Sequence, residues 1–347
     1  MPFKEHVENT LRINPEPTPL FKMLLSALAI TTPLIIGHFN HELFVSMFGS
    51  LMGLVFYLND HFDHFLVRTR HLVVTFILLM ISLSVGAASV GSLYTIAIIL
   101  FVLSFLLGKS KDYGIELERM MLFITLQFLT ASAEVVIKLK LTSLLLYSSI
   151  AFLNYLFWAY VIFKITKHET KATESKRATV KKIIAHNRGI KFPLVCAIFS
   201  TIGYILAQVF EFSHANWIVG TALIVILPDS YQSIYKSAQR VLGTILGVVI
   251  ASVILTYAHN QMLLIAFVFI CSFLMPLGLS QNYWVGNIYI AAMILFFLEI
   301  AAPQSTATHH LAYWRAIDII LGCSIGVLAA IWLKPDIIKK SIKSLRH

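Results

Sequence analysis

The sequence predicts an all-α polytopic membrane protein with about twelve transmembrane helices, built as two parallel six-helix repeats with both termini in the cytoplasm. The apolar composition, the spacing of the apolar segments and the position of the basic residues all point to this fold. Of the 347 residues, 58% are hydrophobic and 13% are charged, whereas a soluble domain carries roughly 25% charged residues. Burying so many apolar side chains requires a lipid environment.

Twelve apolar segments can be identified from their length and their polar interruptions. They lie near residues 20–37, 43–58, 71–89, 93–107, 120–137, 141–163, 192–210, 215–228, 240–258, 262–278, 283–301 and 311–333. A helix needs about 20 apolar residues to cross a bilayer. The second segment of each half, 43–58 and 215–228, is therefore short.

The basic residues give the orientation. With a cytoplasmic N-terminus, 24 of the 27 Lys and Arg residues lie on the cytoplasmic side, and only Lys138, Lys140 and Arg315 lie on the other. This is the positive-inside distribution, and it accounts for the net charge of +10 without a nucleic-acid partner. The first residues lack the apolar stretch of a signal peptide, so we expect no cleavage there. The predicted units are a cytoplasmic tail, a first repeat, a basic linker, a second repeat and a basic tail, over 1–19, 20–163, 164–191, 192–333 and 334–347.

The two halves resemble each other at an offset near 170 residues. VFYLNDHFDHFLVRTRHLVVT aligns with IVILPDSYQSIYKSAQRVLGT, which pairs Asp60 with Asp229 and Thr75 with Thr244. Further on, GKSKDY aligns with GLSQNY. A unit with an even number of helices inserts in the same orientation as its copy, so a pseudo-twofold axis along the membrane normal should relate the two units.

The repeat also indicates a transport path. Short segments at matching places in two halves mark such paths in transporters, and here each ends at an aspartate, Asp60 or Asp229. These carboxylates could accept protons or gate the path, or they could simply be helix ends in contact with water. The apolar side chains that follow, such as Tyr231, Ile234 and Tyr235, predict an amphipathic helix along the cytoplasmic interface.

Other charged residues lie inside the apolar segments, where a charge is costly. Arg240 is either a positive-inside anchor or a guanidinium that binds an anion through a bidentate fork. Arg315 and Asp318 are three residues apart, so an internal salt bridge is the alternative to a functional role. Glu299, near the external end of its segment, is the best single candidate for a proton-coupled carboxylate, with a simple helix-end position as the alternative.

Enzyme, metal and redox chemistry have little support in the sequence. There is no GxSxG, Walker or CxxC motif, so we expect no enzyme, cofactor or ATP-driven pump. Asp60 and His64 have a spacing that can bind metal, but the second half has no matching histidine, and we predict a solvated helix instead. The three cysteines, Cys196, Cys271 and Cys323, read as buried small hydrophobic residues.

Two segments, RVLGTILGVVIASVI (240–254) and YWRAIDIILGCSIGVLAAIWLKP (313–335), resemble the RxxGTxxG and RxxDxxxG helices of the fusaric acid resistance and aromatic acid exporter family. NYWVGNIYIAAMILF, which lies between them, fits the family's penultimate span. The resemblance covers about 215–335. It implies a bacterial inner-membrane exporter of aromatic or other organic acids, driven by protons and in some relatives completed by a periplasmic adaptor. Plant relatives act as organic-anion channels.

We therefore expect a proton-driven exporter of organic anions in the lipid bilayer, with a passive anion channel or a non-transport envelope component as alternatives. Exposed apolar faces would also allow a homodimer. The predicted residues are Arg240, Asp229, Asp60 and Thr244 for substrate binding or gating, Glu299, Asp318 and Arg315 for proton coupling, and Gly243, Gly247 and Gly322 for helix packing.

Overall fold

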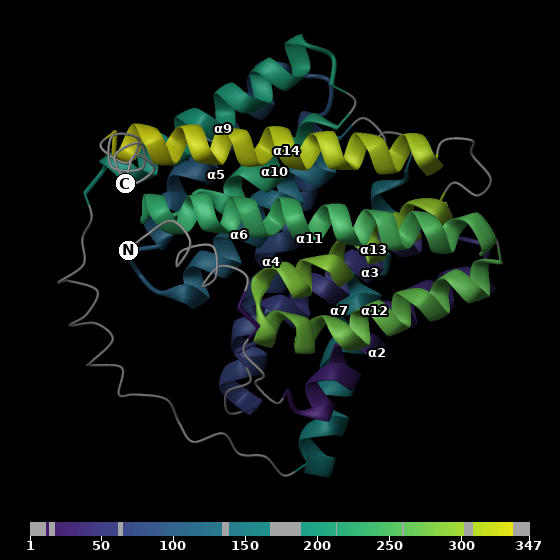
Figure 1. Cartoon of the computed structure of the whole chain (residues 1–347). Coiled ribbons are helices and arrows are strands. Elements are labelled where there is room, and N and C mark those ends of the chain that lie inside the picture. Colours follow the sequence, from purple (N-terminus) through teal and green to yellow (C-terminus); the bar gives the residue numbers. More distant parts are fainter. Residues whose placement is uncertain are drawn as a thin grey trace.

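The computed structural model describes residues 12–13, 18–61, 65–133, 139–166, 189–212, 214–258, 260–301 and 308–335. This part of the chain contains twelve α-helices and no strand, as the sequence predicts. The helices are α2 (Leu20–Phe39), α3 (Leu43–Asn59), α4 (Phe65–Ser89), α5 (Leu93–Ser110), α6 (Ile115–Ala131), α7 (Leu141–Thr166), α9 (Lys191–Val209), α10 (Ala215–Val225), α11 (Ser230–Tyr257), α12 (Gln261–Gln281), α13 (Tyr283–Ala301) and α14 (Thr308–Leu333) (Figure 1).

Within these residues, nine helices are long and apolar enough to cross a membrane. The predicted short segments are short helices: α3 has 17 residues and α10 has 11. At 1.5 Å per residue, α10 spans about 16 Å, roughly half the hydrocarbon thickness. It ends because Pro228 disfavours the helical conformation of the residue before it. The chain becomes helical again at Ser230, where the Asp229 carboxylate accepts a hydrogen bond from the Tyr231 amide.

Several boundaries differ from the prediction. Helices α4 and α11 begin at Phe65 and Ser230, six and ten residues earlier than expected. The predicted interfacial helix is therefore wrong for the second half, because Tyr231, Ile234 and Tyr235 belong to the first turns of an uninterrupted α11. Helix α6 begins earlier than predicted, after Gly114 at φ +115°, and has acidic residues in its first turn, which is a favourable helix start. Most of the predicted linker and both predicted tails lie outside the described residues.

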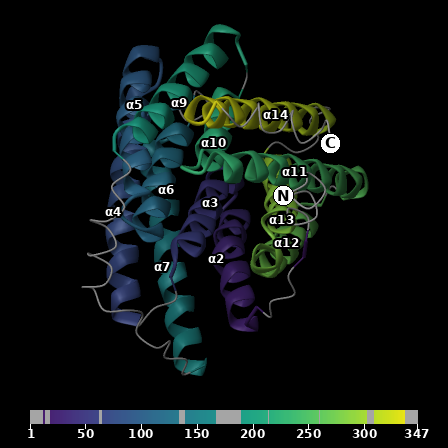
Figure 2. The ribbon, with the colours of Figure 1, turned by 60° about the vertical axis from the view of Figure 1, so that its left-hand side comes forward.

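The two halves pack in corresponding ways. In the first, α2 contacts α3, α3 contacts α7, α4 contacts α6, and α5 contacts α6; in the second, α9 contacts α10, α10 contacts α14, α11 contacts α13, and α12 contacts α13. The halves are joined mainly by α2 with α12 and by α5 with α9, and also by α3 with α13 and α6 with α10. Figure 2 shows α4, α5 and α6 on one side and α11, α12 and α13 on the other, with α2 and α3 between them.

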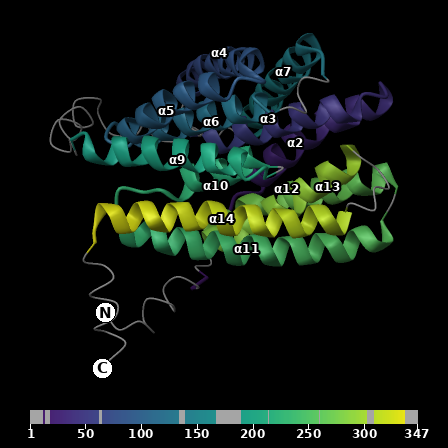
Figure 3. The same cartoon turned by 90° about the horizontal axis from the view of Figure 1, so that it is seen from above.

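The buried core is shared between the halves. One apolar cluster is formed mainly by α2, α3, α4 and α7 with α11, α12 and α13, and a second by α9, α10 and α14 with α5 and α6. Helices α11 and α14 contact each other along one face, opposite α4 and α5 (Figure 3). This arrangement brings α10, α11, α13 and α14 together around the polar residues described next.

Candidate functional site

Two glycines allow α11 to lie directly against α13. A Cβ atom added at Gly243 would lie within 3.0 Å of the Trp284 carbonyl oxygen, and one at Gly247 within 3.0 Å of the Ile288 carbonyl oxygen. Such distances leave no room for any side chain. The predicted packing role of both glycines fits this geometry, and the close approach fixes the side chains that α11 and α13 direct toward each other.

Arg240 lies at this contact and is 8% exposed. Its Nη1 donates to the Tyr283 hydroxyl at 2.8 Å and more weakly to Asn287 Oδ1 at 3.4 Å. The Asn287 amide in turn donates to the Arg240 carbonyl oxygen at 3.0 Å and to Thr244 Oγ1 at 2.7 Å. Arg240 and Thr244, both predicted from the sequence, therefore share Asn287 as a common partner. The groups that hold the guanidinium are all neutral.

Arg315 and Asp318 lie on α14, beside α10. The Arg315 guanidinium carbon is 3.9 Å from the centre of the Trp217 ring, a cation–π contact. Asp318 Oδ2 is 3.6 Å from His214 Nδ1. The internal salt bridge that was the alternative to a functional role for Arg315 and Asp318 is not among the ion pairs of the described residues. The Trp217 ring and the His214 imidazole lie against the two side chains instead.

The two arginines act on each other electrostatically, and both are largely buried, with Arg315 at 6% exposed. Burial, followed by the charge of Arg315, lowers the pKa of His214, so this imidazole is neutral at neutral pH. The cluster thus contains two guanidinium groups and one carboxyl group, that of Asp318. Within the described residues, Arg240 Nε and Arg315 Nε are buried N–H groups without a hydrogen-bond partner. Buried charges require partners, and an entering anion would supply one.

Gly322 brings α14 close to α10 in the same way that Gly243 and Gly247 serve α11. A Cβ atom at Gly322 would lie within 3.0 Å of both the Ile218 carbonyl oxygen and the Thr221 side chain. Four helices thus meet with little side-chain volume between their backbones. Arg240 and Arg315 project from α11 and α14, the two helices that carry these glycines.

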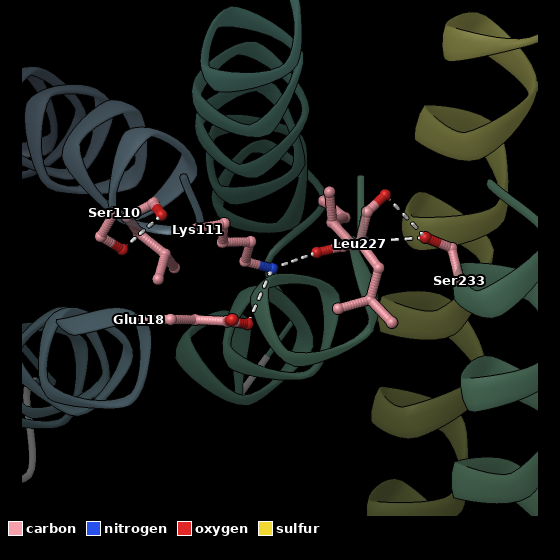
Figure 4. A network of polar contacts seen from close by, with 7 residues as sticks. Ser110, Lys111, Glu118, Leu227 and Ser233 are labelled. Atoms are coloured by element: carbon pink, nitrogen blue, oxygen red, sulfur yellow. Dashed lines mark hydrogen bonds and ion pairs between the residues drawn. The ribbon is translucent and has the colours of Figure 1, made fainter. Parts of the chain in front are cut away.

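A second polar network lies where α10 ends, and it joins the two halves (Figure 4). Lys111 lies just after α5, and its side chain is 4% exposed. Its Nζ donates to the Ile226 carbonyl oxygen at 2.6 Å and lies 3.6 Å from Glu118 Oε1 on α6. On the other side of the break, Ser233 Oγ accepts from the Leu227 amide at 2.7 Å and donates to the Leu227 carbonyl oxygen at 3.2 Å. Burial lowers the pKa of Lys111, while the charge of Glu118 raises it.

The Lys111 network makes a testable contribution to stability. The substitution Lys111→Met should lower the free energy of unfolding by about 1–3 kcal/mol, because the buried Ile226 carbonyl oxygen loses its donor. Thermal or denaturant unfolding in detergent would measure the loss. The matched control is Lys109→Met, because Lys109 is more exposed and pairs with Asp112 only three residues away. Equal losses in the two variants would contradict a role for the network.

The remaining predicted residues lie outside the arginine cluster. Asp60 is buried at the end of α3, where it forms an ion pair with Arg68 and accepts a hydrogen bond from the Tyr155 hydroxyl. Its sequence counterpart Asp229 is exposed and serves as the N-cap of α11. Glu299 is buried in the last turn of α13. The structure therefore brings together Arg240, Thr244, Arg315 and Asp318. Asp60, Asp229 and Glu299 lie elsewhere.

Sequence reasoning missed four neutral partners and one lysine. Tyr283 and Asn287 lie within the NYWVGN segment of the family resemblance, where they could have been noticed, whereas Trp217, His214 and Lys111 carry no local signal. The alternative metal site rests on His64, which lies outside the described residues. Among the residues that the structure describes, no group of three or more metal-binding side chains is found.

Residues 202–329 match the family model of fusaric acid resistance protein-like proteins, so the resemblance is confirmed over the helices that build the cluster. An uncharacterized protein of Haemophilus influenzae is 28% identical over 131 residues, which are 38% of this chain and 18% of that protein. Inner membrane protein YccS of Escherichia coli is 23% identical over 137 residues, 39% of this chain and 18% of YccS. Uncharacterized protein slr1298 of Synechocystis is 26% identical over 139 residues, 40% of this chain and 18% of that protein.

The matched region thus covers less than a fifth of the length of each relative. No solved structure matches the chain. The long apolar helices, the family match and the relative that is an inner membrane protein agree that this chain is a multi-pass membrane protein.

Proposed function

We propose that this protein is a secondary transporter that exports aromatic or other organic acid anions across the bacterial inner membrane in exchange for protons. The observation that carries the proposal is the arginine cluster: Arg240 and Arg315 are buried at the meeting point of four helices, and the buried Asp318 lies one turn after Arg315 on α14. Arginine binds carboxylates through paired hydrogen bonds. An aromatic acid would also find the Trp217 and Tyr283 rings beside the two guanidinium groups.

The cluster fits a transporter because a transport site must be reached through protein and not through lipid. Toward the start of α11, Lys236 lies 5.4 Å from the centre of the Tyr283 ring, and its charge interacts with those of Glu118 and Arg240. Polar groups therefore continue from the cluster toward the end of the helix that the basic residues assign to the cytoplasm. We expect an anion to enter along this path.

The proposal includes the parallel repeat and the cytoplasmic termini. Two observations support a pseudo-twofold axis. The helices of each half make matching contacts, and the repeat, in which α2 corresponds to α9 and α5 to α12, turns the α2–α12 contact into the α5–α9 contact. The distribution of Lys and Arg supports the orientation. Cysteines introduced at Lys140 and Asn260 should react with an impermeant reagent only from outside the cell, and a cysteine at Tyr113 only from the cytoplasm. Reaction of all three from one side would contradict the topology.

Transport itself can be measured in proteoliposomes with an acidic interior and a membrane potential clamped at zero. The purified protein should accumulate radiolabelled benzenesulfonate inside, because protons leaving the vesicle would drive anion entry. This probe stays ionised, and a permeant weak acid such as benzoate would distribute in the opposite direction by passive diffusion. Empty liposomes are the control.

Three outcomes would contradict the exporter. Anion flux that follows the membrane potential and ignores the pH gradient would indicate a channel. Failure of a broad panel of organic anions to exchange at all would favour a non-transport envelope component. Accumulation only in the presence of a second protein would assign the activity to a complex, such as an assembly with a periplasmic adaptor.

A further inference from the structure

One histidine of the first half, His71, corresponds to an arginine of the cluster in the second half. In the alignment of the halves that pairs Asp60 with Asp229 and Thr75 with Thr244, His71 stands opposite Arg240. Both residues lie one turn before a buried threonine whose hydroxyl accepts from an asparagine amide, Asn59 for Thr75 and Asn287 for Thr244. The first half thus has a titratable imidazole where the second has a permanent charge.

His71 has a second imidazole beside it. The ring centres of His61 and His71 are 5.1 Å apart, with the rings nearly perpendicular at 74°. His61 Nε2 is buried and has no hydrogen-bond partner among the described residues. At this separation the two rings can share one proton, because two charged imidazoles side by side would repel each other.

The charged groups facing the pair come from α3, α4 and α6. Asp60, at the end of α3, is already paired with Arg68 of α4, and α6 contributes Glu116 and Arg119. Among the described residues, the charged groups that face the pair are thus two acidic and two basic side chains. Burial lowers the pKa of His61, followed by a raising effect of Glu116. His61 therefore takes up a proton at a lower pH than a free histidine does.

The start of α6 connects this pair with the arginine cluster. Arg119 interacts electrostatically with His61 on one side and with Lys236 on the other, and Lys236 lies over the Tyr283 ring that holds Arg240. The neighbouring Glu118 also acts on Lys236. A change in charge at the histidines is thus felt by charged groups that lead to the anion site.

We propose that His61 and His71 form the site that binds the coupling proton, so that the first half of the protein carries the proton and the second half carries the anion. This inference rests on the proposed function and assigns proton coupling to a different place from Glu299, Asp318 and Arg315. The pair is charged when it faces the acidic side and neutral when it faces the cytoplasm. In each transport cycle the pair binds and releases one proton, so its charge changes by one and no covalent bond other than N–H forms or breaks.

The test separates exchange from coupling. The substitution His71→Gln should leave the exchange of labelled for unlabelled benzenesulfonate, measured without a pH gradient, within about twofold of the unmodified protein. It should reduce accumulation driven by an acidic interior at least tenfold. His61→Gln should act in the same direction, whereas His38→Gln, on α2, should change neither measurement. Absence of exchange in the unmodified protein would defeat the proposed function. Normal exchange together with normal driven accumulation in both His71→Gln and His61→Gln would overturn this inference alone.

A second measurement decides the matter if His71→Gln does not fold. Because the pKa of His61 is lowered in the folded protein, the unfolded chain binds this proton first. The free energy of unfolding should therefore fall as the pH drops through about 6.5 toward the folded pKa. His61→Gln should flatten this fall and should also abolish the proton uptake that accompanies release of the anion. An unchanged pH profile and unchanged proton uptake would overturn the inference.

Discussion

Replacement of Arg240 by alanine should abolish anion transport while leaving the protein folded. A charge-assisted hydrogen bond contributes about 1.5–3 kcal/mol, so the variant should bind the anion about ten to a hundred times more weakly. The fold should tolerate the change because Tyr283 and Asn287 are neutral, and Asn287 keeps its bonds to Thr244 and to the backbone of residue 240. Exchange of benzenesulfonate in proteoliposomes would measure the loss, after size-exclusion chromatography of the variant.

Two further variants make this result specific. Arg240→Lys keeps the charge but loses the planar fork, so it should retain part of the exchange activity. Arg70→Ala removes an exposed arginine of α4 and should behave like the unmodified protein. If Arg240→Ala exchanged anions as fast as Arg70→Ala does, the guanidinium would not contact the substrate and the proposed site would be wrong.

A large loss of stability is expected when Gly247 is replaced. In Gly247→Ala, the new methyl group would lie within 3.0 Å of the Ile288 carbonyl oxygen and of the Ala291 Cβ atom. Neither group can move without displacing α13, so the helices must separate. Overpacking of this kind costs about 1–3 kcal/mol, and Gly247→Val should cost more. Unfolding in detergent, followed by circular dichroism, would measure the difference.

The matched control is another buried helical glycine. A Cβ atom at Gly220 would meet only the end of the Leu126 side chain, at 3.1 Å, which can rotate away. Gly220→Ala should therefore cost less than 1 kcal/mol, in part because alanine favours the helix. Similar losses for Gly247→Ala and Gly220→Ala would mean that α11 and α13 are not in the close contact described above.

The sequence was sufficient for the number and order of the helices, because hydropathy and the basic residues report directly on burial in lipid. The predicted starts of α4 and α11 were too late, because basic residues near each start resemble a polar loop. These are Arg68 and Arg70 in α4, and Lys236 and Arg240 in α11. Hydropathy cannot distinguish a charged residue that faces water from one that faces other helices. The family motif pointed to Arg240 and Thr244 together with Gly243 and Gly247, because all four residues lie on the face of α11 that contacts α13.

The side-chain partners were beyond the reach of sequence reasoning. The local spacing of Arg315 and Asp318 predicts a pair, yet Trp217 and His214 on another helix take the two side chains. In the same way, the matching of Asp60 and Asp229 in the alignment says nothing of Arg68 and Tyr155, which give Asp60 a different environment. Contacts between helices depend on how the bundle closes, and this is settled only in three dimensions.

The early end of α10 has a mechanical consequence. The terminal carbonyl groups of a helix carry a partial negative charge, and here the Lys111 ammonium, which belongs to the other half of the protein, lies against the first carbonyl beyond that end. Pulling the halves apart at this point would leave the Ile226 carbonyl oxygen without its donor. Motion of one half against the other therefore costs least where this contact is kept, or where water can replace it.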